Sequence, residues 1–337
     1  MIVCLDGAAG RFLAFWSVME TATFAYLGTE LVGVTVGEAQ NPRKTIPRAI
    51  KLTFLRIVFF YILSVFFLGM LVPYNSSDLI FANSKSNSAA ASPFVVAIRL
   101  SGISTLPGIV NGCILLFVFS ACNSDLYTAS RTIYSLAREG KAPRFLAYTD
   151  KRGVPVYSLA LSALFSLLAF MNVAENSTVV FGYFVNLVTI FGLLTWISIL
   201  VTHIYFVRAR KAQGVPEAEL AYVAPLGVWG SYGALGFCIL IALFKNYTAF
   251  VHSPKSYGNF DYKNFITGYI GIPLYLAMIL GYKLAYRKSS ISPTKVDLYT
   301  GKEVYDREEE EFLAREEKGG RAHSGSWFYT TFISWLY

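Results

Sequence analysis

A carboxylate lies within the first long apolar stretch of the chain. Residues 24–37 are mostly apolar, and Glu30 follows directly after Gly28 and Thr29. Inside a membrane a carboxylate is costly, so it usually faces a cavity, a partner or a proton path. A glycine at the same depth favours a helix that unwinds there, because exposed carbonyls and amides can replace a solute's water. The pattern therefore predicts a broken helix with a polar site at residues 24–30.

Close helix packing is the alternative explanation for the glycines of this stretch. Gly28, Gly33 and Gly37 would let neighbouring backbones approach, as small residues do in membranes. Glu20 is a second acid, ten positions before Glu30. On an unbroken helix that spacing separates the two side chains by about 80° around the axis, so they need not share a face. We interpret Glu20 as an interfacial charge rather than as part of an outer vestibule.

A second polar feature lies within residues 107–129. Ser120, Asn123 and Ser124 begin a polar stripe on an otherwise apolar segment. Such a stripe either bonds neighbouring helices or lines a solute path, and the residues alone leave both open.

Other residues with catalytic or metal-binding chemistry are scattered. The three histidines, His203, His252 and His323, fall in unrelated segments. The cysteines also lie far apart, so neither a metal pair nor a disulfide framework is indicated. We therefore expect no enzyme active site, no metal and no cofactor.

The composition indicates the environment of these residues. Of 337 residues, 55% are hydrophobic and 15% are charged, whereas soluble proteins carry about 25% charged residues. This excludes a soluble globular enzyme. The apolar residues form blocks of about 20, the length that a helix needs to cross a bilayer. We predict an all-α membrane protein with seven transmembrane helices, at about residues 12–37, 56–73, 107–129, 155–172, 179–207, 226–250 and 266–286.

Lysine and arginine in the short loops indicate the orientation. Segments 38–55, 131–152 and 208–222 together hold thirteen basic residues, and the alternate segments hold five. The positive-inside rule places the first set in the cytosol. We expect a transmembrane domain at residues 1–286 and a cytosolic tail at 287–337, the tail including a charged helix or a solvated acidic stretch. Because the loop charge reports topology, we expect the lipid bilayer as a partner and no nucleic acid.

Several long motifs resemble those of one family. One runs from Asn41 to Ile50, and others lie at residues 15–17, 24–33, 120–127, 129–132, 136–143, 152–155, 202–209 and 224–227. These stretches closely resemble the fungal amino acid permeases of the amino acid/polyamine/organocation superfamily. The likeness runs from about residue 11 to about residue 300.

The resemblance carries an expectation about the fold. Members of that family have twelve spans, which implies that the seven seen here correspond to spans six to twelve and that the first five are absent. The family fold is an inverted repeat of five plus five helices with two terminal helices. Its substrate lies between two broken helices, of which this chain would supply the second. We expect the chain to be incomplete.

The resemblance also implies roles for residues. Those expected at the substrate are Phe24, Ala25, Tyr26, Leu27, Gly28 and Thr29. The main-chain carbonyls of Phe24, Ala25 and Leu27 would accept from the substrate ammonium, with Tyr26 or Thr29 near its side chain. Glu30 matches an acid of the family that is tied to proton or charge coupling, and we expect it to be the proton-coupling residue. Ser120, Asn123 and Ser124 would be supporting polar residues.

The resemblance implies an amino acid transporter, with a proton as the coupling ion and alternating access around the break. We expect it in a fungal plasma membrane. Two alternatives stay open. One is an amino acid sensor built on a permease scaffold, and the other is a truncated product without transport activity.

Overall fold

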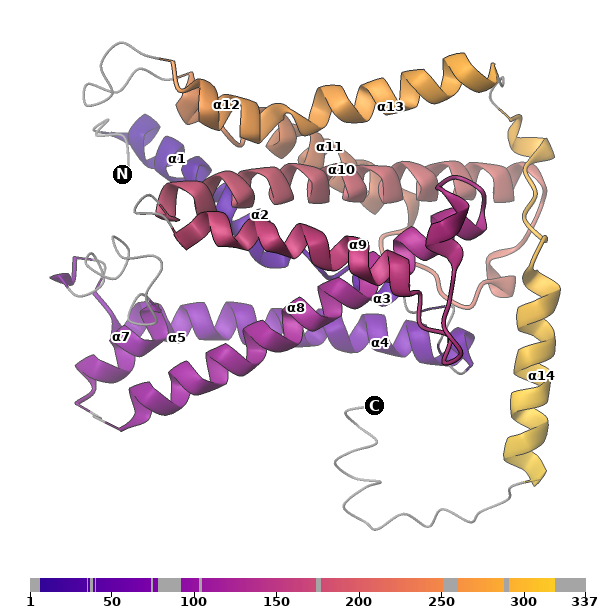
Figure 1. The fold of residues 1–337 in the computed structure, drawn as a ribbon, viewed down its shortest axis with the longest axis horizontal. Coiled ribbons are helices and arrows are strands. Elements are labelled where there is room, and N and C mark those ends of the chain that lie inside the picture. The colour runs from indigo at the N-terminus through magenta and orange to yellow at the C-terminus, as the bar shows by residue number, and fades with distance from the viewer. Residues whose placement is uncertain are drawn as a thin grey trace. The chain divides into compact units, whose positions relative to one another are not determined.

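The computed structural model describes residues 7–34, 36, 39, 41–73, 75–77, 92–102, 105–173, 177–250, 260–287 and 291–318. Within these ranges the regular structure is helical, and no strand occurs (Figure 1). The predicted all-α class is therefore confirmed.

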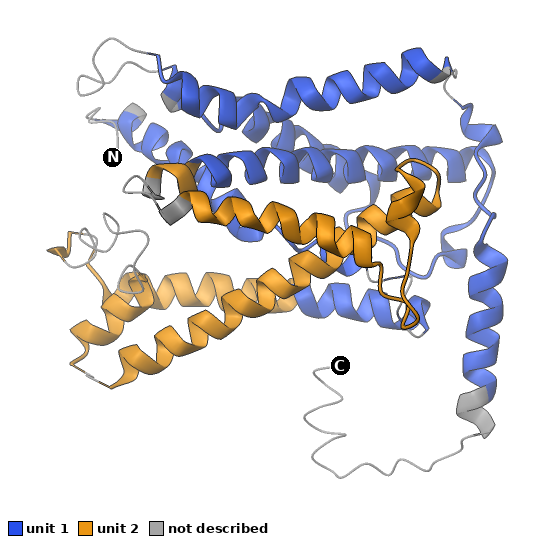
Figure 2. Ribbon diagram, viewed as in Figure 1, with its two compact units in different colours: residues 1–53, 183–337 blue, residues 54–182 orange. Residues whose placement is uncertain are grey.

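The helices fall into two compact units (Figure 2). Unit 1 comprises residues 1–53 and 183–337, and unit 2 comprises residues 54–182. Unit 1 thus combines the first and the last segments of the chain. The boundary at residue 286, between a transmembrane domain and a cytosolic tail, stays a prediction.

Five helices of the described chain are long and apolar enough to cross a membrane. The first, Pro42–Leu71, consists of α4 (Pro42–Ile57), the π-helical turn η2 (Val58–Ile62) and α5 (Leu63–Leu71). The others are formed by α8 (Leu106–Arg138), α10 (Ser177–Ala212), α11 (Gly227–Phe244) and the pair α12 (Tyr262–Tyr269) and α13 (Gly271–Tyr286).

The other two predicted spans are not single long α-helices. Residues 12–37 include α1 (Ala8–Ser17), α2 (Met19–Tyr26) and α3 (Leu31–Val34). Residues 155–172 form α9 (Val156–Ser166), which continues as the 3-10 helix η5 (Leu167–Val173). A 3-10 helix rises about 2 Å per residue against about 1.5 Å in an α-helix, so the α9–η5 pair reaches further than its residue count suggests.

The core of unit 1 lies between α10 and α11. Its buried members are Ile190, Leu193, Leu194, Cys238, Ile241 and Ala242. Trp16 of α1, Trp196 of α10 and Tyr275 of α13 pack against this cluster. The close approach of α13 depends on Gly271, where a Cβ atom would lie 3.0 Å from Ile190 Cγ2. This core fixes α10, the helix on which the site described below is built.

Unit 2 has a smaller buried core than unit 1 within the described residues. Its remaining elements are α7 (Pro93–Leu100) and η4 (Arg144–Ala147). Val96 and Ala97 of α7 pack with Val72, and the buried Ser158 hydroxyl of α9 donates to the Leu146 carbonyl at 2.8 Å.

The remaining elements of unit 1 are short, apart from the last. They are η6 (Glu217–Glu219), η7 (Tyr247–Ala249), η8 (Pro293–Lys295) and α14 (Lys302–Lys318). Of the two alternatives for the acidic part of the tail, a charged helix or a solvated stretch, the structure has the helix α14. It is tied to the start of α4, because Arg43 forms ion pairs with Asp306 and, at 2.7 Å, with Glu309.

Candidate functional site

The first apolar segment is interrupted at residues 27–30. Helix α2 ends at Tyr26, and Leu27 is already extended, with φ −62° and ψ 147°. Gly28 has φ +97°, a left-handed value that strains any residue with a side chain. The chain becomes helical again at Leu31. The interruption falls within the predicted stretch, and it depends on glycine at position 28.

The Glu30 carboxylate closes this turn. Its Oε2 atom accepts hydrogen bonds from the Gly28 N–H at 3.1 Å and from the Trp196 indole Nε1–H at 3.0 Å. Both donors are uncharged, and the ion pairs between described residues do not include Glu30. Hydrogen bonds to a charged acceptor are stronger than those between neutral groups. Within the described residues, two uncharged donors thus hold the carboxylate in place.

Helix α10 approaches the break closely at Gly192. A Cβ atom at this position would lie 3.1 Å from Leu27 Cδ1 and 3.2 Å from Leu27 Cγ. Trp196 follows four positions later on the same face of the helix. One face of α10 therefore receives both the Leu27 side chain and the Glu30 carboxylate.

The main chain at the break is partly used within the turn. The Phe24 carbonyl accepts from the Leu27 N–H at 3.2 Å, and the Gly28 carbonyl accepts from the Leu31 N–H at 3.2 Å. A carbonyl oxygen has two lone pairs, so such bonds leave acceptor capacity. The residues expected at the substrate form one continuous segment around the end of α2: Phe24, Ala25, Tyr26, Leu27, Gly28 and Thr29. Their contact with a substrate stays a prediction.

The supporting polar residues lie on a different element, in unit 2. Ser120, Asn123 and Ser124 are exposed on α8. The Ser124 hydroxyl donates to the Ser120 carbonyl of its own helix at 3.1 Å. The supporting role of these residues stays a prediction.

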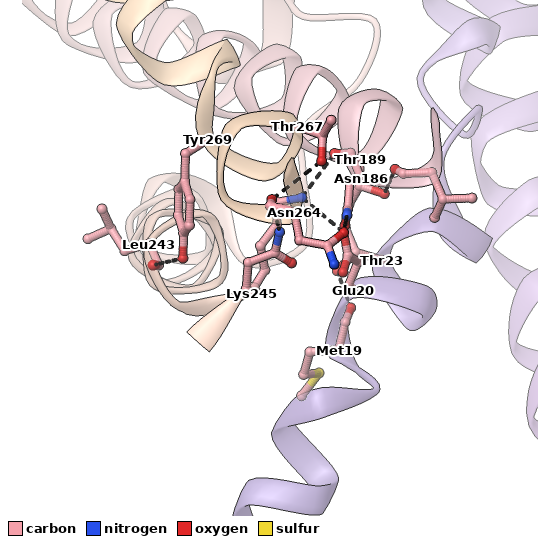
Figure 3. A network of polar contacts seen from close by, with 12 residues as sticks. Met19, Glu20, Thr23, Asn186, Thr189, Leu243, Lys245, Asn264, Thr267 and Tyr269 are labelled. Atoms are coloured by element: carbon pink, nitrogen blue, oxygen red, sulfur yellow. Dashed lines mark hydrogen bonds and ion pairs between the residues drawn. The ribbon is translucent and has the colours of Figure 1, made fainter. Parts of the chain in front are cut away.

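A second polar cluster of unit 1 surrounds Lys245, directly after α11 (Figure 3). The Lys245 side chain is fully buried, with 0% exposed, and that of Glu20 is 19% exposed. Lys245 Nζ lies 3.0 Å from Glu20 Oε1 and donates to the Asn186 carbonyl oxygen at 2.9 Å. Glu20, which the sequence led us to interpret as an interfacial charge, is therefore the partner of a buried cation.

Three asparagines extend this cluster to α12. The Asn186 amide contacts Asn264 Oδ1 at 3.2 Å, and with its oxygen and nitrogen exchanged it would donate to Glu20 Oε2 at 2.8 Å. Asn246 Nδ2 donates to the Asn264 carbonyl at 3.0 Å. Asn264 in turn donates from Nδ2 to Asp261, the N-cap residue of α12, at 2.6 Å. Polar groups from α2, α10, the end of α11 and α12 thus meet at one place.

Sequence reasoning missed Lys245. This lysine falls inside the predicted span 226–250, where the apolar pattern hides it. A signal was available, because a charge inside an apolar block requires a partner and Glu20 is a second such charge. The pairing itself joins residues 225 positions apart, and spacing in the sequence gives no access to it.

One histidine connects two helices of unit 1. His203 Nδ1 lies 2.8 Å from the Ser231 hydroxyl, which connects α10 to α11. The described residues contain no group of three or more His, Cys, Asp or Glu side chains placed to hold a metal ion.

Comparison with known proteins shows a consistent likeness. The family model named Amino acid permease matches residues 4–291. The chain is 53% identical over 334 residues to the dicarboxylic amino acid permease of Saccharomyces cerevisiae, covering 98% of this chain and 54% of that protein. It is 43% identical over 297 residues to an uncharacterized amino-acid permease of Schizosaccharomyces pombe, C777.04, covering 87% of this chain and 55% of the other.

A more distant relative is the lysine-specific permease of S. cerevisiae, 41% identical over 286 residues, which cover 85% of this chain and 45% of that protein. The chain thus spans about half the length of the curated relatives it matches. No solved structure matches it.

Proposed function

The chain belongs to the amino acid permease family, and from this we propose that it supplies the half of an amino acid transporter that contains the second broken helix. The observation that carries the proposal is the interruption between α2 and α3, inside an apolar segment. An interrupted helix offers main-chain groups at membrane depth, and these can replace the water around a zwitterion. The family and the long apolar helices make the chain a multi-pass membrane protein.

Acidic amino acids are the first substrates to test. The relative at 53% identity is named for dicarboxylic amino acids. We place the substrate ammonium at the carbonyl end of α2, formed by Phe24, Ala25 and Leu27, and the substrate side chain near Tyr26 or Thr29. The transporter works by alternating access in the plasma membrane, with residues 1–286 in the bilayer and residues 287–337 in the cytosol.

Glu30 is the proposed proton-coupling group. It accepts from two uncharged donors, Gly28 N–H and Trp196 Nε1–H. A proton that neutralises Glu30 would therefore leave no cation unpaired. Such a carboxylate can change its charge during a transport cycle at lower cost than one with a buried counter-ion.

A hybrid permease tests the transport function. It joins this chain, in frame, to the preceding half of the S. cerevisiae dicarboxylic amino acid permease, and is produced in yeast cells without their own uptake of acidic amino acids. We expect uptake of labelled aspartate and glutamate by the hybrid and none by the preceding half alone. A hybrid that reaches the cell surface and takes up no amino acid would contradict the proposal.

The variant Glu30→Gln tests proton coupling in the same hybrid. The amide keeps the size of the side chain and accepts the same bonds, but it cannot be protonated in the working range of pH. We expect uptake that no longer rises as the outer pH falls, with an unchanged amount of protein at the surface. Glu303→Gln, on the exposed side of α14, is the matched control. If uptake by the Glu30→Gln variant depends on pH in the same way as uptake by the parent hybrid, the coupling role is excluded.

A further inference from the structure

The geometry around Lys245 points to a positioning role, and we infer that Lys245 and Glu20 fix the outer end of α2 and thereby set the shape of the helix break. The pair goes beyond the proposed binding and coupling residues, because neither member lies at the break itself. Glu20 is the second residue of α2, and the break begins directly after Tyr26.

The first argument is the burial of the cation. Lys245 has no exposed side-chain surface, and among the described residues its Nζ atom donates to Glu20 Oε1 at 3.0 Å and to the Asn186 carbonyl oxygen at 2.9 Å. Removing one member of a buried ion pair leaves an uncompensated buried charge, which is strongly destabilising. The buried Lys245 cation therefore holds the Glu20 carboxylate, and with it this end of α2, in place.

The second argument is that Lys245 lies in a short segment, residues 244–247, that forms several hydrogen bonds with α1 and α2. Trp16 Nε1–H donates to the Phe244 carbonyl at 2.9 Å, and the Tyr247 hydroxyl donates to the Leu13 carbonyl at 2.6 Å. Residues 244–247 thus contact α1 twice and α2 once. Among these contacts, the Lys245–Glu20 ion pair is the one made with α2, the helix that ends at the break.

The third argument is that α10 binds the segment at both ends. Asn186 of α10 lies at the Lys245–Glu20 pair, and Trp196 of α10 binds Glu30. Asn186 and Trp196 are ten residues apart, which corresponds to about 15 Å along an α-helix. Helix α10 therefore fixes the distance between the Lys245–Glu20 pair and Glu30. Because α2 has only eight residues, a displacement of its outer end is transmitted to the inner one.

The fourth argument concerns alternatives to an ion pair. Apolar side chains of similar volume often stabilise a protein as well as a buried ion pair does, so stability alone does not account for the pair. An ion pair with a defined carbonyl contact differs from apolar packing because it specifies one arrangement. This favours positioning as its function.

Substitutions in the hybrid permease separate positioning from charge balance, and this readout rests on the proposed function. Lys245→Met alone leaves Glu20 unpaired, so we expect less protein at the surface. The double variant Glu20→Gln/Lys245→Met removes both charges, so we expect the amount to recover. The KM for uptake should stay raised by about tenfold, equivalent to about 1.4 kcal/mol, because α2 is no longer held. Lys245→Arg keeps the charge and should keep the KM within about threefold of the parent, a change of less than about 0.65 kcal/mol.

A matched control is Lys141→Met, which breaks an exposed ion pair with Glu139, 2.6 Å long. It should change neither the surface amount nor the KM. If the double variant recovers the parent KM together with the surface amount, the pair only balances charge and the inference is wrong.

A second measurement uses the 337-residue chain without a transport assay. Thr29→Cys places a thiol on the exposed turn of the break, in a chain whose four native cysteines are replaced by alanine. The labelling rate with a water-soluble thiol reagent is compared between the background that keeps Glu20 and Lys245 and the Glu20→Gln/Lys245→Met background. We expect the two rates to differ at least about threefold, a difference of about 0.65 kcal/mol or more. Equal rates would overturn the inference, whereas absent uptake by the parent hybrid would speak only against the proposed function.

Discussion

Asn41, at the start of α4, combines a left-handed backbone with a buried side chain. Its φ is +47°, and it is 8% exposed. Neither amide atom of its side chain has a hydrogen-bond partner within the described part of the chain. Its carbonyl accepts from the Lys44 and Thr45 N–H groups, each at 3.1 Å, and so begins the helix. The backbone of Asn41, and not its amide, therefore carries the structural role.

Two substitutions test this assignment. Asn41→Gly keeps the left-handed backbone and removes the unpaired amide, so we expect the free energy of unfolding to change by less than about 1 kcal/mol. Asn41→Val forces a β-branched side chain into the same backbone, and we expect a loss of about 1–3 kcal/mol. The thermal midpoint of the detergent-solubilised chain measures both. If Gly and Val destabilise equally, the amide is required after all.

At the scale of elements, α10 is the helix on which the candidate site is assembled. It provides Gly192 for Leu27, Trp196 for Glu30 and Asn186 for the Lys245 pair. Helix α12 also contributes to the cluster around Lys245. It can approach Asn246 closely because Gly268 has no side chain. A Cβ atom at position 268 would lie 2.8 Å from Asn246 Cγ and still closer to its Nδ2.

Gly268→Ala should therefore separate α12 from the Asn246 side chain. Asn246 is 5% exposed, so it has little room to move. We expect a loss of about 1–3 kcal/mol from overpacking and a lower thermal midpoint. Gly281→Ala is the control, since a Cβ atom there meets nothing within 4 Å. In a helix interior that change stabilises by up to about 1 kcal/mol. Equal midpoints for the two variants would show that the contact at Gly268 is relaxed.

For the whole molecule, local patterns predicted the helices and missed the pairings. Apolar blocks predicted seven spans, of which five contain long apolar helices, and a glycine beside an acid predicted the interruption near Glu30. The division of residues 155–172 into α9 and η5 has no comparable signal. The contacts of Glu20 with Lys245 and of Arg43 with Asp306 join distant segments. Such pairings depend on how helices pack, and no spacing rule along the chain contains that information.

The Arg43 contacts allow a prediction about the tail. The Arg43 side chain is 33% exposed, and those of Asp306 and Glu309 are 40% and 23% exposed. An ion pair this accessible contributes about 1 kcal/mol or less and weakens in salt. We expect Arg43→Ala to release α14 without unfolding the rest of the chain.

Cleavage by a protease that cuts after glutamate measures this release. Arg43→Ala should speed cleavage within α14, and the parent should become faster to cleave as the salt concentration rises. Arg307→Ala, on the exposed side of α14, is expected to behave as the parent does. Cleavage of Arg43→Ala at the parent rate would show that other contacts hold the tail helix.

The hydrogen bond between Trp196 and Glu30 has an optical consequence. Excitation of an indole moves electron density from the pyrrole ring toward the benzene ring, so a negative charge beside Nε1 stabilises the excited state. An ionised Glu30 carboxylate 3.0 Å from Trp196 Nε1 would shift the emission of this tryptophan to the red, and an uncharged side chain would remove that shift. The emission of Trp196 is therefore expected to report the charge of Glu30, once the other four tryptophans of the chain are replaced.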